Sequence, residues 1–385
     1  MASVDRRDWV IVCGGIHRRG GMDRANAALA QYLAASGDAI HLVAHDVDRT
    51  WLADARATVS IVPRAGGSYI AGEFALERRG RHVVGALRRA GRRTHLIANG
   101  SNIAGADVNW VHCVHHAWPC SDACAPAWFR LKNRATKAWA RRRERRAIRS
   151  AALVVTNSTR TTDDVVNHLD VPPRVVHTVY LGSDPTWAPA TGPDRAAARQ
   201  RWCGADPARP LIAFVAALGH DTNKGIDTLL DAWARLQSTG WNASLVVAGP
   251  GGTDRWRRKA EPFGDAIRFV GQIDSVGSLL DAADLLVSPV RYEAYGLAAH
   301  EALCRGVPVV ITCTAGVVER LPPEAADLLL PDPPTVDSLT ACLQRWAASP
   351  EMYRRRVEPI SRSLRAYTEE DMARRIVDLA TARAA

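Results

Sequence analysis

Two glutamates, Glu293 and Glu301, lie eight residues apart around the start of an expected short helix in the stretch 284–312. An apolar strand precedes this helix, and a second apolar strand follows Gly306, so the stretch predicts one βαβ unit. At the carboxyl end of such a strand, backbone amides and the positive end of the helix can hold an anion. We therefore expect a functional site here.

A lysine and the spacing of the two acids narrow the chemistry. Lys224, one of only four lysines, lies beside Gly225 between an expected strand and helix, where a flexible cation suits a phosphate. On one helix, Glu293 and Glu301 would be separated by about 12 Å, beyond the roughly 5–9.5 Å of glycosidase carboxylate pairs. Separate roles are therefore expected for the two acids, and a hydrolytic pair is not.

The first half of the chain carries weaker signals. Gly20 and Gly21 precede an expected helix after the first apolar strand, where backbone N–H groups can approach a ligand. This loop matches neither GxGxxG nor GxxxxGK[ST]. His112 closes a later strand, a position suited to chemistry, although a lone histidine is more often structural.

A short segment after His112 also allows a metal hypothesis. Cys113, His116, Cys120 and Cys124 offer four zinc ligands, but their spacing differs from the usual zinc-finger patterns. An irregular loop after a strand is the simpler interpretation. We therefore assign no metal.

The elements that must position these residues alternate between strand and helix twice along the 385 residues. Pro185, Pro189 and Pro193 interrupt the chain between the two alternations and indicate a linker. The pattern predicts an α/β protein with two Rossmann-like domains facing a cleft, residues 1–184 and 194–365. A final helix, about 366–385, is expected to pack back on the first domain.

The net charge of +10 predicts an attraction to anions, and a strongly basic helix is expected over 128–149. This helix is either a solvated surface or a face for an anionic membrane or acceptor. Nucleic acid is not expected, because no known binding module accompanies the charge. No apolar run approaches the roughly 20 residues of a membrane span, and the start lacks the layout of a signal peptide. We expect a cytoplasmic protein, with peripheral contact at the inner membrane face as an option.

The motif around the two glutamates resembles the signature of the family-four retaining glycosyltransferases. It comprises Glu293-x7-Glu301, Tyr295-Gly296-Leu297 after the first acid, and Gly306-Val307-Pro308 before the second strand. The resemblance implies a GT-B fold, with an N-terminal acceptor domain and a C-terminal domain that binds a nucleotide diphosphate sugar. It further implies metal-independent transfer of a hexose-type sugar, with retention and without a cofactor, to a small-molecule, glycan or lipid acceptor.

The resemblance also implies a role for each matching residue. Glu301 would bind the ribose hydroxyls and Glu293 the transferred sugar, while His112 would contact the donor sugar near the reacting carbon. The diphosphate would meet the Lys224 side chain, the amides of Tyr295, Gly296 and Leu297, and the closing loop with Gly20 and Gly21. The backbone around Phe269 and Val270 would meet the base.

The chain departs from the family pattern in two places. Leu218 and Gly219 occupy positions where members usually place an arginine that contacts the diphosphate, so Arg19 is a candidate substitute. Leu181-Gly182-Ser183-Asp184 replaces a common Asn-Gly pair at the interdomain joint. Two alternatives to a transferase remain. One is a nucleotide-sugar epimerase of the same architecture, and the other, suggested by the missing arginine and the basic helices, is a non-catalytic protein that binds nucleotide sugars or anionic surfaces.

Overall fold

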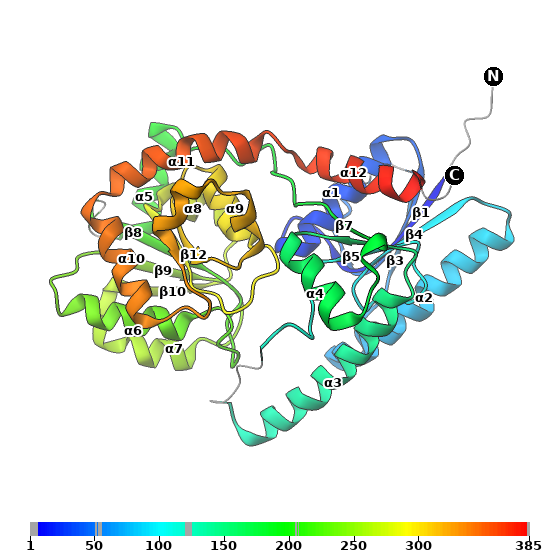
Figure 1. The fold of residues 1–385 in the computed structure, drawn as a ribbon, viewed down its shortest axis with the longest axis horizontal. Helices are drawn as coiled ribbons and strands as arrows, with labels where there is room; N and C mark the ends of the chain where they lie inside the picture. Colours follow the sequence, from blue (N-terminus) through cyan, green and yellow to red (C-terminus); the bar gives the residue numbers. More distant parts are fainter. Residues whose placement is uncertain are drawn as a thin grey trace. The chain divides into compact units, whose positions relative to one another are not determined.

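The computed structural model describes residues 7–50, 52, 56–119, 125–204, 206 and 208–382. The chain divides into two compact units. Unit 1 comprises Met1–Trp118, Leu131–Gly182 and Thr368–Ala385, and unit 2 comprises Pro119–Arg130 and Ser183–Tyr367. Each unit is a parallel sheet with helices packed against it (Figure 1), which confirms the predicted α/β class with two Rossmann-like domains.

Unit 1 contains a seven-stranded parallel sheet in the order β3-β2-β1-β4-β5-β6-β7. Its strands are β1 (Asp8–Ile16), β2 (Ala39–Val47), β3 (Ala57–Ile61), β4 (Thr94–Asn99), β5 (Val108–Val111), β6 (Leu153–Thr156) and β7 (Val176–Thr178). Its main helices are α1 (Gly21–Ala35), α2 (Tyr69–Arg89), α3 (Ala127–Arg149), which starts within the segment assigned to unit 2, α4 (Thr159–Leu169) and α12 (Glu369–Ala382). Short 3-10 turns lie at Ala65–Gly67 and Pro173–Val175.

The last helix of the chain, α12, belongs to unit 1, as the sequence predicts. It packs against α1, and at its first turn Arg18 NH1 donates to Glu369 Oε2 at 2.9 Å. Arg18 also contacts Gln31 on α1, at 2.7 Å. One arginine thus joins the loop after β1 to both helices.

Unit 2 contains a six-stranded parallel sheet in the order β10-β9-β8-β11-β12-β13. Its strands are β8 (Leu211–Val215), β9 (Ser244–Ala248), β10 (Ile267–Gly271), β11 (Leu285–Ser288), β12 (Val309–Thr312) and β13 (Leu329–Leu330). Its helices are α5 (Gly192–Trp202), α6 (Ile226–Gln237), α7 (Asp254–Ala260), α8 (Val276–Ala282), α9 (Leu297–Cys304), α10 (Val336–Ala348) and α11 (Pro350–Arg365), with 3-10 turns at Glu261–Ala266, Gly316–Arg320 and Pro323–Leu328.

The strands of unit 2 are apolar because they lie in the core of that unit. β9 and β12 are buried along their whole length, as expected for parallel strands covered by helices on both faces. Trp233 of α6 and Trp346 of α10 are fully buried against them. Trp187, within the predicted proline-rich linker, is also fully buried, so this segment packs onto unit 2.

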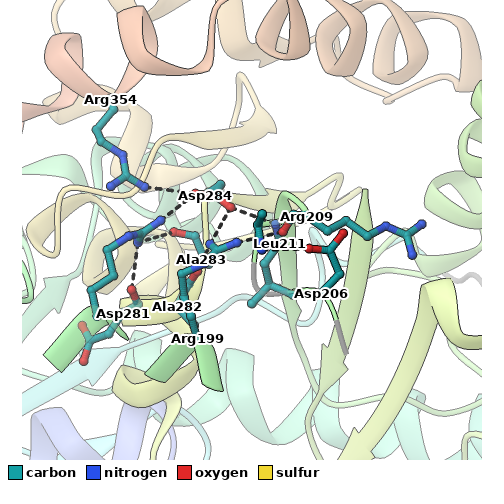
Figure 2. Close-up of polar contacts among 11 residues, drawn as sticks. Arg199, Asp206, Arg209, Leu211, Asp281, Ala282, Ala283, Asp284 and Arg354 are labelled. Atoms are coloured by element: carbon teal, nitrogen blue, oxygen red, sulfur yellow. Dashed lines mark hydrogen bonds and ion pairs between the residues drawn. The ribbon is translucent and has the colours of Figure 1, made fainter. Parts of the chain in front are cut away.

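A network around Asp284 fixes the amino ends of the two central strands of unit 2 (Figure 2). Its Oδ1 accepts hydrogen bonds from Arg195 at 2.6 Å and Arg354 at 3.2 Å. Its Oδ2 accepts from Arg199 at 2.9 Å and from the Leu211 amide at 2.8 Å. Since Leu211 begins β8 and Asp284 directly precedes β11, helices α5 and α11 are tied to both strands.

Candidate functional site

The strand order of unit 2 marks a place for a ligand. β9 and β10 lie on one side of β8, whereas β11, β12 and β13 lie on the other. The connections that leave the carboxyl ends of β8 and β11 therefore diverge, and ligands of such sheets bind at this switch point. The loop after β8 carries Lys224, and the loop after β11 carries Glu293.

Hydrogen bonds join these two loops along their backbones. The Arg291 amide donates to the Asn223 carbonyl at 2.8 Å, and Asn223 Nδ2 donates to the Tyr292 carbonyl at 2.9 Å. The Arg291 guanidinium also binds both carboxylate oxygens of Asp227 on α6, at 3.0 and 2.8 Å. We did not predict Arg291, Asn223 or Asp227, because pairing between residues more than 60 positions apart leaves no local sequence pattern.

This arrangement brings two of the predicted site residues together. Lys224 Nζ lies 2.6 Å from Glu293 Oε2, and both side chains remain partly exposed, at 29% and 22%. Gly225, with φ 72°, is the N-cap residue of α6, and a Cβ on it would lie 1.9 Å from the Pro289 carbonyl oxygen. Glycine at 225 thus lets the two loops approach closely enough for the ion pair to form.

The segment Tyr295-Gly296-Leu297 begins helix α9. Gly296 adopts φ 101° and caps the helix, whose first-turn amides have no partner within the helix. The Tyr295 side chain points into the core, where its hydroxyl lies 3.1 Å from His300 Nδ1 and accepts from Arg320 at 3.3 Å. Burial raises the pKa of Tyr295 and lowers that of His300 to about 3, so this side-chain pair is neutral and structural. Among groups of Tyr295, only the backbone suits a ligand.

The remaining predicted donor contacts lie on α9 and on the edge strand. Glu301 is largely buried and accepts from Arg305 Nε at 3.3 Å. The Phe269 side chain belongs to the core, and its carbonyl accepts from Arg257 at 2.6 Å. The register between β10 and β9 skips Val270, so Val270 has no partner residue in β9. Such bulges expose backbone groups at an edge.

Leu218 lies in the hydrophobic core and therefore takes no place among groups that could face a phosphate. Its amide donates to the Pro250 carbonyl at 2.8 Å. A Cβ on the neighbouring Gly219 would meet no atom within 4 Å. The suggested substitute, Arg19, lies in unit 1 with its guanidinium 3.0 Å from Asp46.

In unit 1, the predicted residues follow two strands. Gly20, with φ 83°, caps α1, and Gly21 is the first residue of that helix. His112 directly follows β5, with its ring 4.5 Å from the ring of Trp110. Burial lowers the pKa of His112 to about 3, and its enclosed Nε2 has no hydrogen-bond partner. The imidazole is thus neutral, with one polar atom left for a ligand.

The zinc hypothesis divides between described and undescribed residues. His115 Nδ1 and His116 Nδ1 both contact the buried Glu144, at 2.7 and 2.9 Å. Burial alone would raise the pKa of Glu144, but these contacts hold it below its usual value. Cys120 and Cys124 lie outside the described residues. Within the described ranges, no group of three or more histidine, cysteine or acidic side chains is arranged to hold a metal.

The basic helix α3 presents large apolar side chains at its start. Trp128 and Leu131 are 67% and 71% exposed, and Lys132 and Arg134 beside them are exposed as well. Further along the helix, a shallow hollow of about 400 Å³ is lined by Arg142, Arg145, Arg146, Arg149 and Ser150. No helix in the described part of the chain is long and apolar enough to span a membrane.

Comparisons with known proteins agree with the motif. The family model "Glycosyltransferase Family 4" matches residues 19–187, and "Glycosyl transferases group 1" matches residues 209–348. An alpha-D-kanosaminyltransferase of Streptomyces kanamyceticus is 27% identical over 70% of this chain and 72% of its own. A GDP-mannose-dependent phosphatidylinositol dimannoside mannosyltransferase of Mycobacterium tuberculosis is 32% identical over 43% of this chain, which spans less than half of that relative (42%).

Solved structures agree in fold. The glycosyltransferase WaaG, involved in lipopolysaccharide biosynthesis, superposes with a TM-score of 0.75 over 97% of this chain and 99% of its own, at 20% identity. HepE of Anabaena, solved with UDP and glucose, gives a TM-score of 0.70 over 98% of this chain and 100% of its own, at 14% identity.

Proposed function

We propose that this chain, which belongs to glycosyltransferase family 4, transfers a hexose-type sugar from a nucleotide diphosphate sugar to an acceptor with retention of anomeric configuration. The observation that carries the proposal is the contact of Lys224 with Glu293 at 2.6 Å, made by two loops at the switch point of the unit 2 sheet. An ordinary surface ion pair forms without hydrogen bonds between the loops that carry its two residues, whereas these two loops are hydrogen-bonded to each other.

The site supports departure of a diphosphate leaving group. Negative charge develops on the leaving phosphate as the sugar bond breaks, and preorganised positive groups stabilise that charge. In our proposal these positive groups are the Lys224 ammonium and the backbone amides at the start of α9, so the reaction needs no bound metal. Glu293 would accept hydrogen bonds from the sugar, Glu301 from the ribose, and the backbone beside Val270 would face the base.

We propose fewer donor contacts for unit 1 than for unit 2. The amides at Gly20 and Gly21 would close over the phosphates, and the neutral His112 would donate from its unpartnered Nε2 to the donor sugar near the reacting carbon. The acceptor is proposed to be a small molecule, a glycan or a lipid. Peripheral binding of a cytoplasmic enzyme to an anionic membrane is supported by the exposed basic and apolar side chains of α3.

A donor screen tests this proposal. Purified protein is incubated with a panel of nucleotide diphosphate sugars, with and without candidate acceptors, and both the released nucleoside diphosphate and the sugar are analysed. Acceptor-dependent release with an α-linked product from an α-linked donor is expected. An epimerised donor without release would indicate the epimerase instead, and tight donor binding without any turnover would indicate a binding protein.

A further inference from the structure

Three charged side chains form a row beside α9 in unit 2. Arg305, the C-cap residue of α9, donates from Nε to Glu301 Oε1 at 3.3 Å and from NH1 to Asp281 Oδ1 at 2.8 Å. The exposed fractions of these side chains are only 10% for Glu301, 13% for Arg305 and 19% for Asp281. Charges removed from water to this extent require partners, so each group depends on its neighbour.

The helix that faces α9 is shaped for this arginine. Gly277 and Asp281 lie four residues apart on α8, and Glu301 and Arg305 are spaced in the same way, so each pair shares a helix face. A Cβ on Gly277 would lie 2.4 Å from Arg305 NH2. Gly277 therefore leaves room for the guanidinium, and Asp281, one turn further on, binds it.

We infer that Arg305 is a positioning residue that sets the Glu301 carboxylate for the ribose hydroxyls of the donor, an inference that rests on the proposed function. A carboxylate that accepts hydrogen bonds from two neighbouring hydroxyls must be ionised and held in one orientation. The Arg305 guanidinium offsets the negative charge of this buried carboxylate, and its Nε holds one of the carboxylate oxygens in place.

Asp281 determines which nitrogen of Arg305 contacts Glu301. An arginine without another partner tends to bind a carboxylate through two parallel hydrogen bonds, which would compete with ribose for both oxygens. Because Asp281 engages NH1, the guanidinium reaches Glu301 through Nε. That contact uses a small part of the acceptor capacity of a carboxylate, which has about four lone-pair sites.

A purely structural role for Arg305 makes a different prediction. A cation at the end of α9 that fills space beside Gly277 would stabilise unit 2 without affecting how the protein distinguishes ribose from 2′-deoxyribose. The ratio of the two dissociation constants therefore separates a positioning role from a structural one.

Calorimetric titration with a panel of ribonucleoside diphosphates and their 2′-deoxy counterparts measures this ratio. The wild-type protein is expected to prefer the ribose form by about tenfold or more, as befits a hydrogen bond to a charged group. In Arg305→Met the preference should fall to within about twofold, mainly through weaker binding of the ribose form. An unchanged ratio in a folded Arg305→Met protein would overturn the inference.

A second variant covers the case in which Arg305→Met does not fold. Gly277→Ala retains every charge but displaces the guanidinium, so it should reduce the ratio by about threefold or more. Arg356→Met is the matched control, because it removes an arginine that pairs with Asp327 at 2.8 Å elsewhere in unit 2 and should leave the ratio unchanged. A wild-type ratio in Gly277→Ala would also count against the inference.

Glu301→Gln distinguishes failure of this inference from failure of the proposed site. If the wild-type protein shows no ribose preference, or if Glu301→Gln retains it, the assignment of Glu301 is wrong and the inference falls with it. If Glu301→Gln loses the preference while Arg305→Met and Gly277→Ala keep it, Glu301 binds ribose and only the role of Arg305 is refuted.

Discussion

At the scale of single residues, the Lys224–Glu293 contact joins two groups with different proposed partners, the diphosphate and the sugar. Removing either charge breaks this ion pair and removes one proposed contact to the donor. We expect Lys224→Ala and Glu293→Gln each to lower kcat/KM for transfer by at least about tenfold, or about 1.4 kcal/mol of barrier. Steady-state kinetics with the donor found in the screen measures the effect.

Lys259→Ala is the matched control for that experiment. Lys259 pairs with Asp231 of α6 at 2.7 Å in the same unit, and this pair is more exposed than Lys224 and Glu293. Its loss should leave kcat/KM within about twofold of the wild-type value, as usual for a surface ion pair. Full activity in Lys224→Ala and Glu293→Gln would refute the site.

The missing family arginine allows a test by addition. A side chain at Gly219 enters open space, because a Cβ there meets no atom within 4 Å. If the diphosphate lies at the loop that carries Lys224, Gly219→Arg should tighten binding of a nucleoside diphosphate by about threefold to tenfold, and added salt should weaken the gain. Gly192→Arg is the control, because Gly192 also borders open space and begins α5, which is tied to the amino ends of the strands; equal affinities in both variants would contradict the placement.

At the scale of elements, the sequence predicts whatever depends on local patterns. The βαβ unit around α9 follows from two apolar strands and the helix between them, and α12 follows from its amphipathic spacing. Its position in unit 1 was also predicted. The Arg291–Asp227 contact could not be foreseen, because it depends on how β8 and β11 come to be neighbours. The buried Trp187 shows the same limit within an expected linker.

Helix α3 carries the prediction that belongs to this scale. Its exposed arginines Arg142, Arg145 and Arg146 should attract anionic lipid, and Trp128 should insert at the interface. We expect the triple replacement of these arginines by glutamine to weaken binding to phosphatidylserine vesicles by at least about tenfold. Trp128→Ala, made separately, should weaken the same binding by about threefold. Co-sedimentation at low and high salt measures binding.

The choice of arginines matters for that experiment. Arg143 is unsuitable, because its side chain pairs with Glu77 at 2.9 Å and packs over Phe74, so its loss would disturb the helix itself. Arg235→Gln is a control on an exposed arginine of unit 2, where it pairs with Asp337. Vesicle binding that is equal in all variants, or absent in the wild-type protein, would count against a membrane role for α3.

At the scale of the whole molecule, each unit encloses a histidine that burial keeps neutral, His112 in unit 1 and His300 in unit 2. An unfolded histidine has a pKa of about 6.5, whereas these two have pKa values of about 3. Between those values the unfolded chain binds a proton that the native chain does not. The free energy of unfolding therefore falls as the pH drops below about 6.5, by up to about 1.4 kcal/mol per pH unit for each histidine.

Unit 2 offers the cleaner test of this acid sensitivity. His300 contacts the Ser183 hydroxyl at 2.9 Å and the Tyr295 hydroxyl at 3.1 Å, and a glutamine can keep such hydrogen bonds without titrating. We expect one calorimetric transition to become less sensitive to pH between 6.5 and 4.5 in His300→Gln, while His220→Gln, which alters an exposed histidine of the same unit, leaves it unchanged. Equal pH dependence of the transition in the wild-type protein and in His300→Gln would contradict the prediction, because it would mean that native His300 already binds a proton. The contacts of His300 with Ser183, Tyr295 and Trp187 in the core oppose such protonation.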